Sequence, residues 1–361
     1  MSEPLVFRWG IISTAAIATT FVKDLLVDPK TRGVNDVVHK VTAVGSRDTA
    51  KAQEFIDSVI KDKSTKAYGS YAEVYADKNV DVIYVATPHT LHYENSMDAI
   101  KAKKHVLCEK PVTANAHEVR ALVAAAKENN VFFMEAMWTR FHPLSLEFKK
   151  IAESGVLGAP TVMHADLSVD FGIKNAPYAG PKIGWWPLLD LGPYPLVWAI
   201  MALFEHPDNK HSKPAITGAM LKTPITGVDR DTTFTLNFTE ANLSAQAILS
   251  CSMNTTGIDP GATIRYEKGI IKIAAPLYCP QSFTVQYLEK GKVVKEETRI
   301  FEYVGRGMHF QADEVARSVR DGKLESDLWG HIKCLTEMEI FDEVRRQGGY
   351  VFPPGVEKVT A

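Results

Sequence analysis

The stretch LVFRWGIISTAAIATTFVKDLLV, residues 5–27, decides the fold of this chain. Its first part, from Leu5 to Ser13, is a short apolar run typical of a buried strand. From Ala15 to Val27 the apolar residues recur at helical spacing. A strand, a tight turn and a helix in this order predict the start of a parallel sheet of βαβ units.

The same alternation continues as far as residue 135. Because strands that alternate with helices favour a parallel, doubly wound sheet, we expect an α/β fold with a Rossmann domain. Further strands are predicted at 40–45, 80–86, 105–108 and 131–135, and helices at 49–60, 71–76, 93–102 and 116–129.

After Phe141 the pattern changes to segments with strand periodicity, joined by Gly and Asn turns. Such runs favour a mainly antiparallel open sheet, and therefore a second, α+β domain. We place the boundary near Arg140 and predict domains of residues 1–140 and 141–361. The strands are predicted at 160–169, 215–222, 232–239, 245–251, 262–267, 269–274, 282–288 and 292–299, and helices at 143–154, near 190, at 308–320 and at 328–347.

The composition is that of an ordinary globular protein. The 361 residues carry a formal charge of −2, which gives no support to a nucleic-acid or anionic-membrane partner. The four cysteines are scattered without a C-x-x-C pair, so no metal site is indicated. The first residues lack the pattern of a secretory signal, and no apolar run is long enough to span a bilayer. We expect a cytoplasmic protein.

The first β-α turn indicates a dinucleotide site. A pyrophosphate on a helix N-terminus needs small residues in this turn, where a G-x-G-x-x-G pattern is usual. Here Ser13, Ala15 and Ala18 stand at the three glycine positions, so the motif is degraded and any positive φ is strained. The residues expected to form this part of the site are Gly10, Ser13, Thr14, Ala15, Ala16 and Ile17.

The end of the second strand favours NADP over NAD. An NAD site usually has an acidic side chain there, whereas the hydroxyl of Ser46 followed by Arg47 suits a 2′-phosphate. A solvated surface arginine is the alternative for Arg47. Because the acidic residue Asp48 stands beside Arg47, NAD remains the alternative cofactor.

Candidate catalytic residues follow the fifth strand and precede a late helix. Lys110 lies where a parallel strand ends, and ligands of open α/β sheets bind outside those ends. Asp190 and Tyr194 are four residues apart, so on one helix they share a face. A lysine or tyrosine with a lowered pKa can remove a hydroxyl proton as hydride leaves carbon. Which of Lys110 and Tyr194 is the base stays open, and Asp190 would orient the substrate or the lysine.

Three segments resemble the glucose-fructose oxidoreductase / inositol dehydrogenase family. They are VATPHTLH at 85–92, HVLCEKP at 105–111 and LDLGPYP at 189–195, and the last two match the E-K-P and D-x-G-x-Y motifs of that family. The resemblance implies an active-site lysine at Lys110 and a nicotinamide cofactor. It implies cofactor contacts by Thr87, Pro88, His89, His92, Glu109 and Lys110. A purely structural role is the alternative for His89 and His92.

Within that family, the segment EAMWTRF at 135–141 and the RWGI start at 8–11 are similar to fungal NADP-dependent D-xylose 1-dehydrogenases and dimeric dihydrodiol dehydrogenases. This similarity implies that Trp138, Arg140, Asp190 and Tyr194 contact a sugar or diol. A packed tryptophan and an ion-paired arginine are the alternatives for Trp138 and Arg140. It also implies a homodimer that forms through the C-terminal sheet. Trp185 and Trp186 are either sugar-facing or part of the core.

The expected reaction is oxidation of an aldopyranose at C1, with D-xylose to D-xylono-1,5-lactone as the preferred case. A trans-1,2-dihydrodiol dehydrogenase would use the same residues on another ring. A non-catalytic NADP-sensing regulator is the alternative from a different class. The joint presence of Lys110, Asp190 and Tyr194 speaks against it, because binding without turnover does not need that set.

Overall fold

The computed structural model describes residues 3–171, 186–224 and 226–360. The chain folds into two compact units. Unit 1 consists of Met1–Trp138, Tyr303–Leu335 and Glu357–Ala361, and unit 2 of Thr139–Glu302 and Thr336–Val356. The first division lies within two residues of the predicted boundary. The return of residues 303–335 to unit 1 differs from the prediction of one continuous second domain.

Unit 1 contains a six-stranded parallel sheet in the order β3-β2-β1-β4-β5-β6. The predicted doubly wound Rossmann sheet is therefore confirmed. The short strand β3 was not predicted, because three residues carry no recognisable period. The strands are β1 (Leu5–Ile12), β2 (Val37–Gly45), β3 (Lys66–Tyr68), β4 (Val82–Val85), β5 (His105–Cys108) and β6 (Phe133–Glu135).

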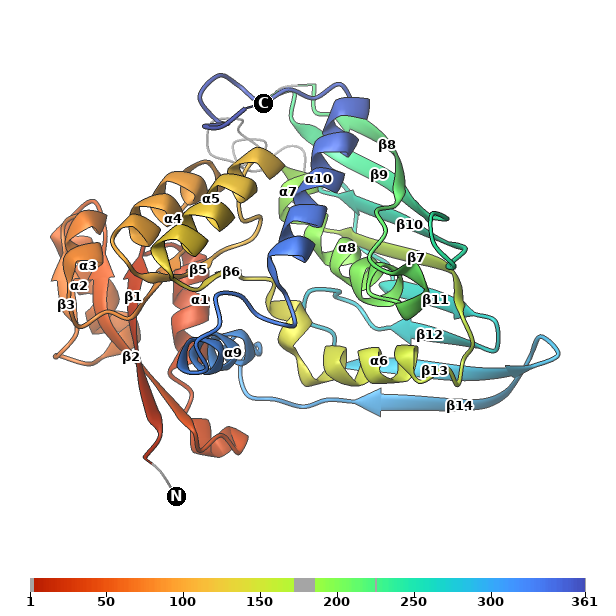
Figure 1. The fold of residues 1–361 in the computed structure, drawn as a ribbon, viewed down its shortest axis with the longest axis horizontal. Coiled ribbons are helices and arrows are strands. Elements are labelled where there is room, and N and C mark those ends of the chain that lie inside the picture. Colours follow the sequence, from red (N-terminus) through yellow and green to blue (C-terminus); the bar gives the residue numbers. More distant parts are fainter. Residues whose placement is uncertain (1–2, 172–185, 225, 361) are drawn as a thin grey trace. The chain divides into compact units, whose positions relative to one another are not determined.

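Helices follow these strands as predicted, and their boundaries have local causes. Helix α5 begins after Asn115, whose side chain accepts a hydrogen bond from the Glu118 N–H, and it ends at Asn130 in the left-handed conformation. Helices α4 and α5 pack side by side (Figure 1). The helices are α1 (Ala16–Leu25), α2 (Thr49–Phe55) with a π-helical turn (Ile56–Ile60), α3 (Tyr71–Ala76), α4 (His92–Lys101), α5 (Ala116–Asn129) and α9 (His309–Arg320).

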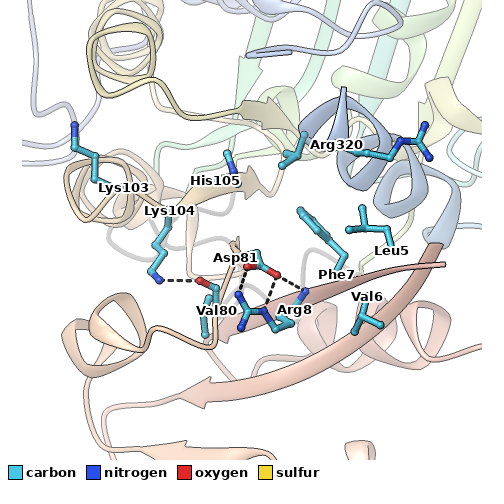
Figure 2. A pocket seen from close by; sticks show the side chains of 11 residues that line it. Leu5, Val6, Phe7, Arg8, Val80, Asp81, Lys103, Lys104, His105 and Arg320 are labelled. Atoms are coloured by element: carbon cyan, nitrogen blue, oxygen red, sulfur yellow. Dashed lines mark hydrogen bonds and ion pairs between the residues drawn. The ribbon is translucent and has the colours of Figure 1, made fainter. Parts of the chain in front are cut away.

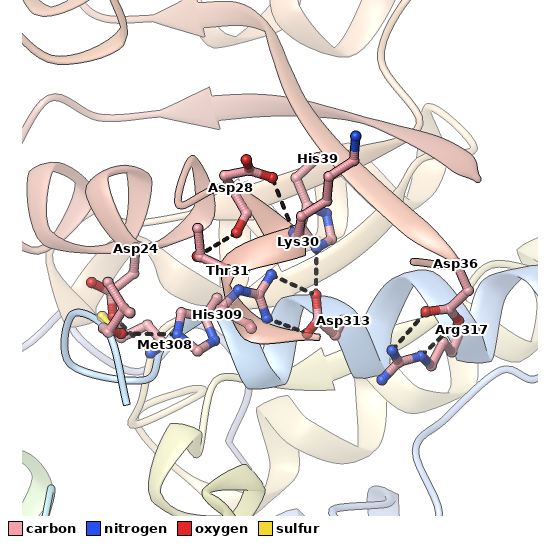
Figure 3. Close-up of polar contacts among 12 residues, drawn as sticks. Asp24, Asp28, Lys30, Thr31, Asp36, His39, Met308, His309, Asp313 and Arg317 are labelled. Atoms are coloured by element: carbon pink, nitrogen blue, oxygen red, sulfur yellow. Dashed lines mark hydrogen bonds and ion pairs between the residues drawn. The ribbon is translucent and has the colours of Figure 1, made fainter. Parts of the chain in front are cut away.

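Buried ion pairs explain why α9 belongs to unit 1. Asp313 accepts hydrogen bonds from Arg32 at 2.7 Å and contacts Nε2 of His39 at 2.9 Å, and all three side chains are buried (Figure 3). On the segment before α9, the Asp24 carboxylate accepts the Met308 N–H at 2.9 Å. Buried charges are stable only when they are paired, so these contacts hold the returning segment against the sheet.

Unit 2 is built on an eight-stranded sheet in the order β14-β13-β12-β11-β7-β10-β9-β8 (Figure 1). The pairs are antiparallel except for β7 and β10, which run parallel, so the prediction of a mainly antiparallel sheet is confirmed. The strands are β7 (Pro160–Ser168), β8 (Ala215–Lys222), β9 (Asp229–Phe238), β10 (Ala245–Ser252), β11 (Ala262–Tyr266), β12 (Gly269–Ile273), β13 (Ser282–Glu289) and β14 (Lys292–Ile300).

The helices of unit 2 correct one prediction. Asp190 is the last residue of α7 (Pro187–Asp190), whereas Tyr194 lies in the first turn of α8 (Pro193–Ala199), so the two do not share one continuous helix. Pro193 has no N–H to continue the hydrogen bonding of α7. Between the helices, a Cβ on Gly192 would lie 2.2 Å from the Leu188 carbonyl oxygen. The remaining helices are α6 (Pro143–Glu153), a π-helical turn (Ile200–Phe204) and α10 (His331–Gln347), within which the division between the units falls.

Two features are absent from the described residues. No helix there is long and apolar enough to cross a membrane. The same part of the chain contains no group of three or more His, Cys, Asp or Glu residues placed to hold a metal ion.

Candidate active site

The turn between β1 and α1 has the features of a phosphate-binding turn. Ser13 has a φ of +89°, the backbone conformation for which the usual motif has glycine. Its N–H donates to the Gly45 carbonyl at 3.0 Å. Ala15 and Ala16 are exposed, and no side chain caps the N-terminus of α1, so its first N–H groups face outward for an anion.

Gly10, in the strand before this turn, is closely packed. A Cβ on this residue would lie 2.8 Å from Val74 and 2.9 Å from Val80, so only glycine allows the close packing of β1 against α3. We predicted Gly10 and Ile17 as cofactor residues. The structure places Gly10 in the interior and Ile17, which is 36% exposed, on the first turn of α1.

The end of β2 supplies a hydroxyl and a guanidinium. Ser46 is buried, and Arg47 is exposed without a hydrogen bond or ion pair among the residues that the structure describes. The neighbouring Asp48 is the N-cap of α2, and its carboxylate accepts the Ala50 N–H at 2.8 Å. Because this acid is used as a helix cap, the arrangement favours a 2′-phosphate over a free 2′-hydroxyl.

The loop after β4 holds Thr87, Pro88 and His89. The Thr87 Oγ1 atom is buried and has no hydrogen-bond partner in the described part of the chain, which leaves it available to a ligand. Pro88 is exposed and His89 is half-buried, in a short 3₁₀ helix, His89–Leu91. These positions fit the predicted cofactor contacts of the loop.

His92, also predicted as a cofactor residue, is instead fully buried. Its Nδ1 lies 2.7 Å from the Pro111 carbonyl oxygen and its Nε2 lies 2.8 Å from the Thr87 carbonyl oxygen. Burial lowers the pKa of His92 to about 4, against the effect of the two carbonyl groups. The ring joins the loops that follow β4 and β5, so it shapes the site without being exposed to it.

The segment that follows β5 carries Lys110 at the edge of the sheet. The Glu109 carboxylate accepts the Tyr84 hydroxyl at 2.6 Å and the Lys110 N–H at 3.2 Å. Both Glu109 and Lys110 are buried, and the Lys110–Pro111 peptide bond is cis. A buried lysine at the carboxyl edge of a parallel sheet is the strongest candidate for a catalytic group in unit 1.

Glu135 is a functional candidate that the sequence reasoning did not assign. It is 1% exposed at the end of β6, where its Oε1 accepts the Val112 N–H at 2.9 Å and its Oε2 accepts Trp329 Nε1–H at 2.9 Å. Burial raises the pKa of Glu135 to about 7, while these hydrogen bonds and the Lys110 charge oppose the rise. Glu135 could have been identified from the sequence by its position at a strand end, the same signal that singled out Lys110.

In unit 2, Tyr194 is buried and its ring lies edge-on to Tyr278, with 5.6 Å between the ring centroids. Asp190 is half-buried beside a small apolar recess lined by Phe171, Trp186 and Met253, among others. The Asp229 carboxylate accepts the Leu188 N–H at 2.5 Å and so fixes the start of α7.

The other residues predicted to contact substrate are packed inside the protein. Arg140 is 3% exposed, and its guanidinium lies 3.5 Å from the Glu205 carboxylate. Trp138 is 5% exposed. Trp186 is 1% exposed and packs on Phe352 at 4.5 Å between ring centroids, which makes it a core residue. Trp185 lies outside the described residues.

A cavity of about 480 Å³ opens at the opposite, amino ends of β1, β4 and β5 (Figure 2). Several of its charged side chains are already engaged, since Arg8 forms a paired contact with Asp81 and Lys104 donates to the carbonyls of Asp77 and Val80. Ligands of open α/β sheets bind at the carboxyl ends of strands, so this cavity is not the candidate site.

Comparison with known proteins identifies the family of this chain. Residues 7–137 match the model of an oxidoreductase family with an NAD-binding Rossmann fold, the family of glucose-fructose oxidoreductase and inositol dehydrogenase. The chain is 36% identical to D-xylose 1-dehydrogenase (NADP(+)) of Hypocrea jecorina, over 97% of this chain and 94% of that protein. It is 34% identical to trans-1,2-dihydrobenzene-1,2-diol dehydrogenase of Danio rerio, over 96% of this chain and 98% of that one. The chain belongs to this oxidoreductase family.

Solved structures show the same fold. Aldose-aldose oxidoreductase from Caulobacter crescentus, complexed with glycerol, matches with a TM-score of 0.79 at 20% identity, over 96% of this chain and 98% of that one. A 3-ketoreductase from Actinomadura kijaniata, in complex with NADP and TDP-benzene, matches with a TM-score of 0.77 at 21% identity and the same coverage. At these identities the likeness concerns the fold alone.

Proposed function

We propose that this chain oxidises the C1 hydroxyl of an aldopyranose, with D-xylose to D-xylono-1,5-lactone as the preferred reaction and NADP as the cofactor. The observation that carries the proposal is the buried Glu109–Lys110–Pro111 segment at the carboxyl edge of the parallel sheet. The near full-length similarity to a D-xylose 1-dehydrogenase supports the choice of substrate.

The residues of unit 1 fit NADP. The exposed turn at Ala15 and Ala16 suits the pyrophosphate, and the Thr87 hydroxyl lies at the strand ends where the nicotinamide half would bind. Arg47 is proposed to hold the 2′-phosphate, because its exposed guanidinium can donate two parallel hydrogen bonds to phosphate oxygens. The similar D-xylose 1-dehydrogenase is itself named as an NADP(+) enzyme.

The chemistry requires two coupled transfers from the substrate. The bound cofactor supplies the acceptor for the hydride that leaves C1. Lys110 or Tyr194 takes the proton of the C1 hydroxyl, so that the C1–O bond becomes the lactone carbonyl. Asp190 is proposed to orient the sugar, with Trp138 and Arg140 shaping the place where it binds. The sequence pattern supports these assignments.

The experiment is a substrate panel read by the near-ultraviolet absorbance of reduced nicotinamide. Purified protein is mixed with NADP or NAD and, in turn, D-xylose, D-glucose or trans-cyclohexane-1,2-diol. Turnover with NADP and D-xylose supports the proposal. Turnover of the diol alone favours the alternative of a trans-1,2-dihydrodiol dehydrogenase, which the similarity to the Danio rerio enzyme supports. NADP binding without turnover on any member would favour a regulatory protein.

We further propose that the chain forms a homodimer through the open face of the unit 2 sheet. Along β10, residues alternate between buried and accessible, and the accessible face includes Gln246, Ile248 and Ser250. Ile248 is 36% exposed, an apolar side chain on a face that is otherwise polar in this strand. Light scattering after gel filtration should give the mass of a dimer, and Ile248→Glu should give that of a monomer.

A further inference from the structure

In the Lys110 segment, residues 109–112, strand hydrogen bonding ends at Glu109, whose N–H donates to the Val85 carbonyl at 2.9 Å. The last register pairs of β5 and β6 are Leu107 with Met134 and Cys108 with Glu135. Beyond them, Pro111 has no N–H to donate, so side chains must fix the direction of the segment. On the β6 side, the Val112 N–H donates to Oε1 of Glu135 at 2.9 Å.

Glu135 is itself held rigidly. Its second oxygen accepts the indole N–H of Trp329 at 2.9 Å, and Trp329 is 1% exposed. The carboxylate therefore connects the Lys110 segment to the part of the chain that returns to unit 1 before α10. A carboxylate with two well-directed donors has little freedom to turn, so it can define where a neighbouring backbone group lies.

Glu135 and Lys110 also interact through their charges. The Lys110 ammonium lowers the pKa of Glu135, which burial raises to about 7. The interaction is mutual, so an ionised Glu135 favours the charged form of Lys110. The other groups that face Glu135 are the thiols of Cys108 and Cys334, and burial raises the pKa of the Cys108 thiol well above its usual value.

We infer that Glu135 is a positioning residue of the reaction, which fixes Lys110 through the Val112 amide and sets the charge environment of the lysine. This inference deepens the proposed function and rests on it, because it gives Glu135 a role only if Lys110 acts on the substrate. Glu135 touches neither substrate nor cofactor in this assignment. Its effect is therefore expected in kcat and in the titration of Lys110, and not in the affinity for NADP.

The test compares Glu135→Gln and Glu135→Ala with a matched control. Glu118 is also buried in unit 1, and its carboxylate also accepts two N–H groups, here both from the backbone, of Ala114 at 3.0 Å and of Lys358 at 2.6 Å. Burial also raises the pKa of Glu118. Glu118→Gln thus removes a similar buried charge whose two backbone partners lie outside the Lys110 segment.

Three readouts are needed. The first is kcat with D-xylose, or with the diol if that is the substrate, and the second is KM for NADP. The third needs neither turnover nor cofactor: the rate of acetylation of Lys110 by acetic anhydride is followed against pH by peptide mass spectrometry. The midpoint of that curve is the pKa of Lys110 in the intact protein.

We expect Glu135→Gln to lower kcat about tenfold, because the amide has one acceptor oxygen for the two donors, Val112 N–H and Trp329 Nε1–H, and so holds the backbone beside Lys110 less firmly. Glu135→Ala should lower kcat further, with KM for NADP unchanged in both variants. The acetylation midpoint of Lys110 should move to lower pH in Glu135→Gln, by up to about one unit. Glu118→Gln should match the wild type in all three readouts.

The inference is overturned if Glu135→Gln matches Glu118→Gln in kcat and leaves the Lys110 titration where it is in the wild type. If Glu135→Ala does not fold, Glu135→Gln alone decides. Failure of the proposed function gives a different result. If Lys110 takes no part in the reaction, Lys110→Ala retains the activity of the wild type. The acetylation curve still tests the contact between Glu135 and Lys110 in that case.

Discussion

In two buried polar clusters of unit 1, the pKa of the carboxylate is shifted in opposite directions. In the Asp313 cluster, formed by Trp9, Arg32, His39 and Asp313, burial alone would raise the pKa of Asp313, but hydrogen bonds from His39 and Arg32 outweigh it and lower the value. In the Glu135 cluster, formed by Lys110, Val112, Glu135 and Trp329, burial outweighs the partners and raises the pKa of Glu135 to about 7.

The opposite pKa shifts indicate a structural role for the Asp313 cluster and make the Glu135 cluster a candidate for a chemical role. Trp9 Nε1–H donates to Nδ1 of His39, which leaves the other ring nitrogen to donate to Asp313, so the His39–Asp313 contact joins α9 to β2 of the sheet. The Glu135 cluster lies at the carboxyl edge of the sheet, next to a buried lysine. Groups with strongly shifted pKa values that lie where ligands bind are candidates for function.

The largest expected effect is on catalysis at the Glu135 cluster. Lys110→Ala should lower kcat by about 10²- to 10⁴-fold, the usual contribution of a positioned acid or base. NADP affinity, measured by titration calorimetry, and the midpoint of thermal unfolding should stay close to the wild type. Unchanged turnover would remove Lys110 from the mechanism.

The Asp313 cluster should show the opposite behaviour. Asp313→Ala leaves the buried Arg32 guanidinium unpaired and should lower the free energy of unfolding by about 3–5 kcal/mol, with kcat unchanged at low temperature. The control is Asp36→Ala, which breaks the exposed pairs with Arg317 and Arg320 and should cost less than about 1 kcal/mol. Urea unfolding measures both, and equal losses would contradict the distinction.

Stability should also depend on pH through Glu135. Its pKa is raised from 4.5 to about 7 in the folded protein, so the folded state binds more protons between those values. The contribution of Glu135 to the free energy of unfolding is therefore greatest below pH 4.5. It falls by about 3 kcal/mol in total as the pH rises to about 7. Glu135→Gln should flatten this part of the unfolding curve against pH. The same slope in the variant would show that other groups cause it.

A smaller effect is expected at the end of β2. Arg47→Ala should weaken NADP binding by about 10- to 100-fold and leave NAD binding unchanged, as expected for loss of a charge-assisted hydrogen bond to phosphate. Lys51→Ala, an exposed cation on the helix that follows, is the control. An unaltered preference for NADP over NAD in Arg47→Ala would refute the assignment of the 2′-phosphate.

The smallest expected effect is at the turn before α1. Ser13→Gly should raise the free energy of unfolding by about 1 kcal/mol, because glycine tolerates the φ of +89° that strains serine. Thr14→Gly, at a neighbouring position without a positive φ, should lower it or leave it unchanged. If both variants lose stability equally, Ser13 is not strained.

Much of the fold follows from local patterns in the sequence. The alternation from Leu5 to Glu135 predicted the parallel sheet, because buried strands and amphipathic helices have periods that can be read directly. The return of α9 to unit 1 could not be read in this way. It depends on contacts such as Met308 N–H to Asp24, between residues 284 positions apart, and no local pattern reports a pairing at that distance.

The candidate site was predicted in part. Lys110 was found because it lies where a buried strand ends and within an E-K-P motif, whereas Glu135 was passed over although it ends the next strand of the sheet. The prediction that Asp190 and Tyr194 share one helix was wrong because Gly192 and Pro193 end one helix and begin another. For Arg140 the sequence left substrate contact and an ion pair open, and it could not name the partner, because the contact with Glu205 is a tertiary one that spacing does not reveal.

The most direct test of the proposed reaction follows the hydride itself. The protein is incubated with NADP and D-xylose that carries deuterium at C1, and the reduced cofactor is analysed by mass spectrometry. We predict that the reduced nicotinamide carries the deuterium and that the sugar product is the lactone. Reduced cofactor without deuterium, or no reduced cofactor at all from a protein that binds NADP, would contradict oxidation at C1.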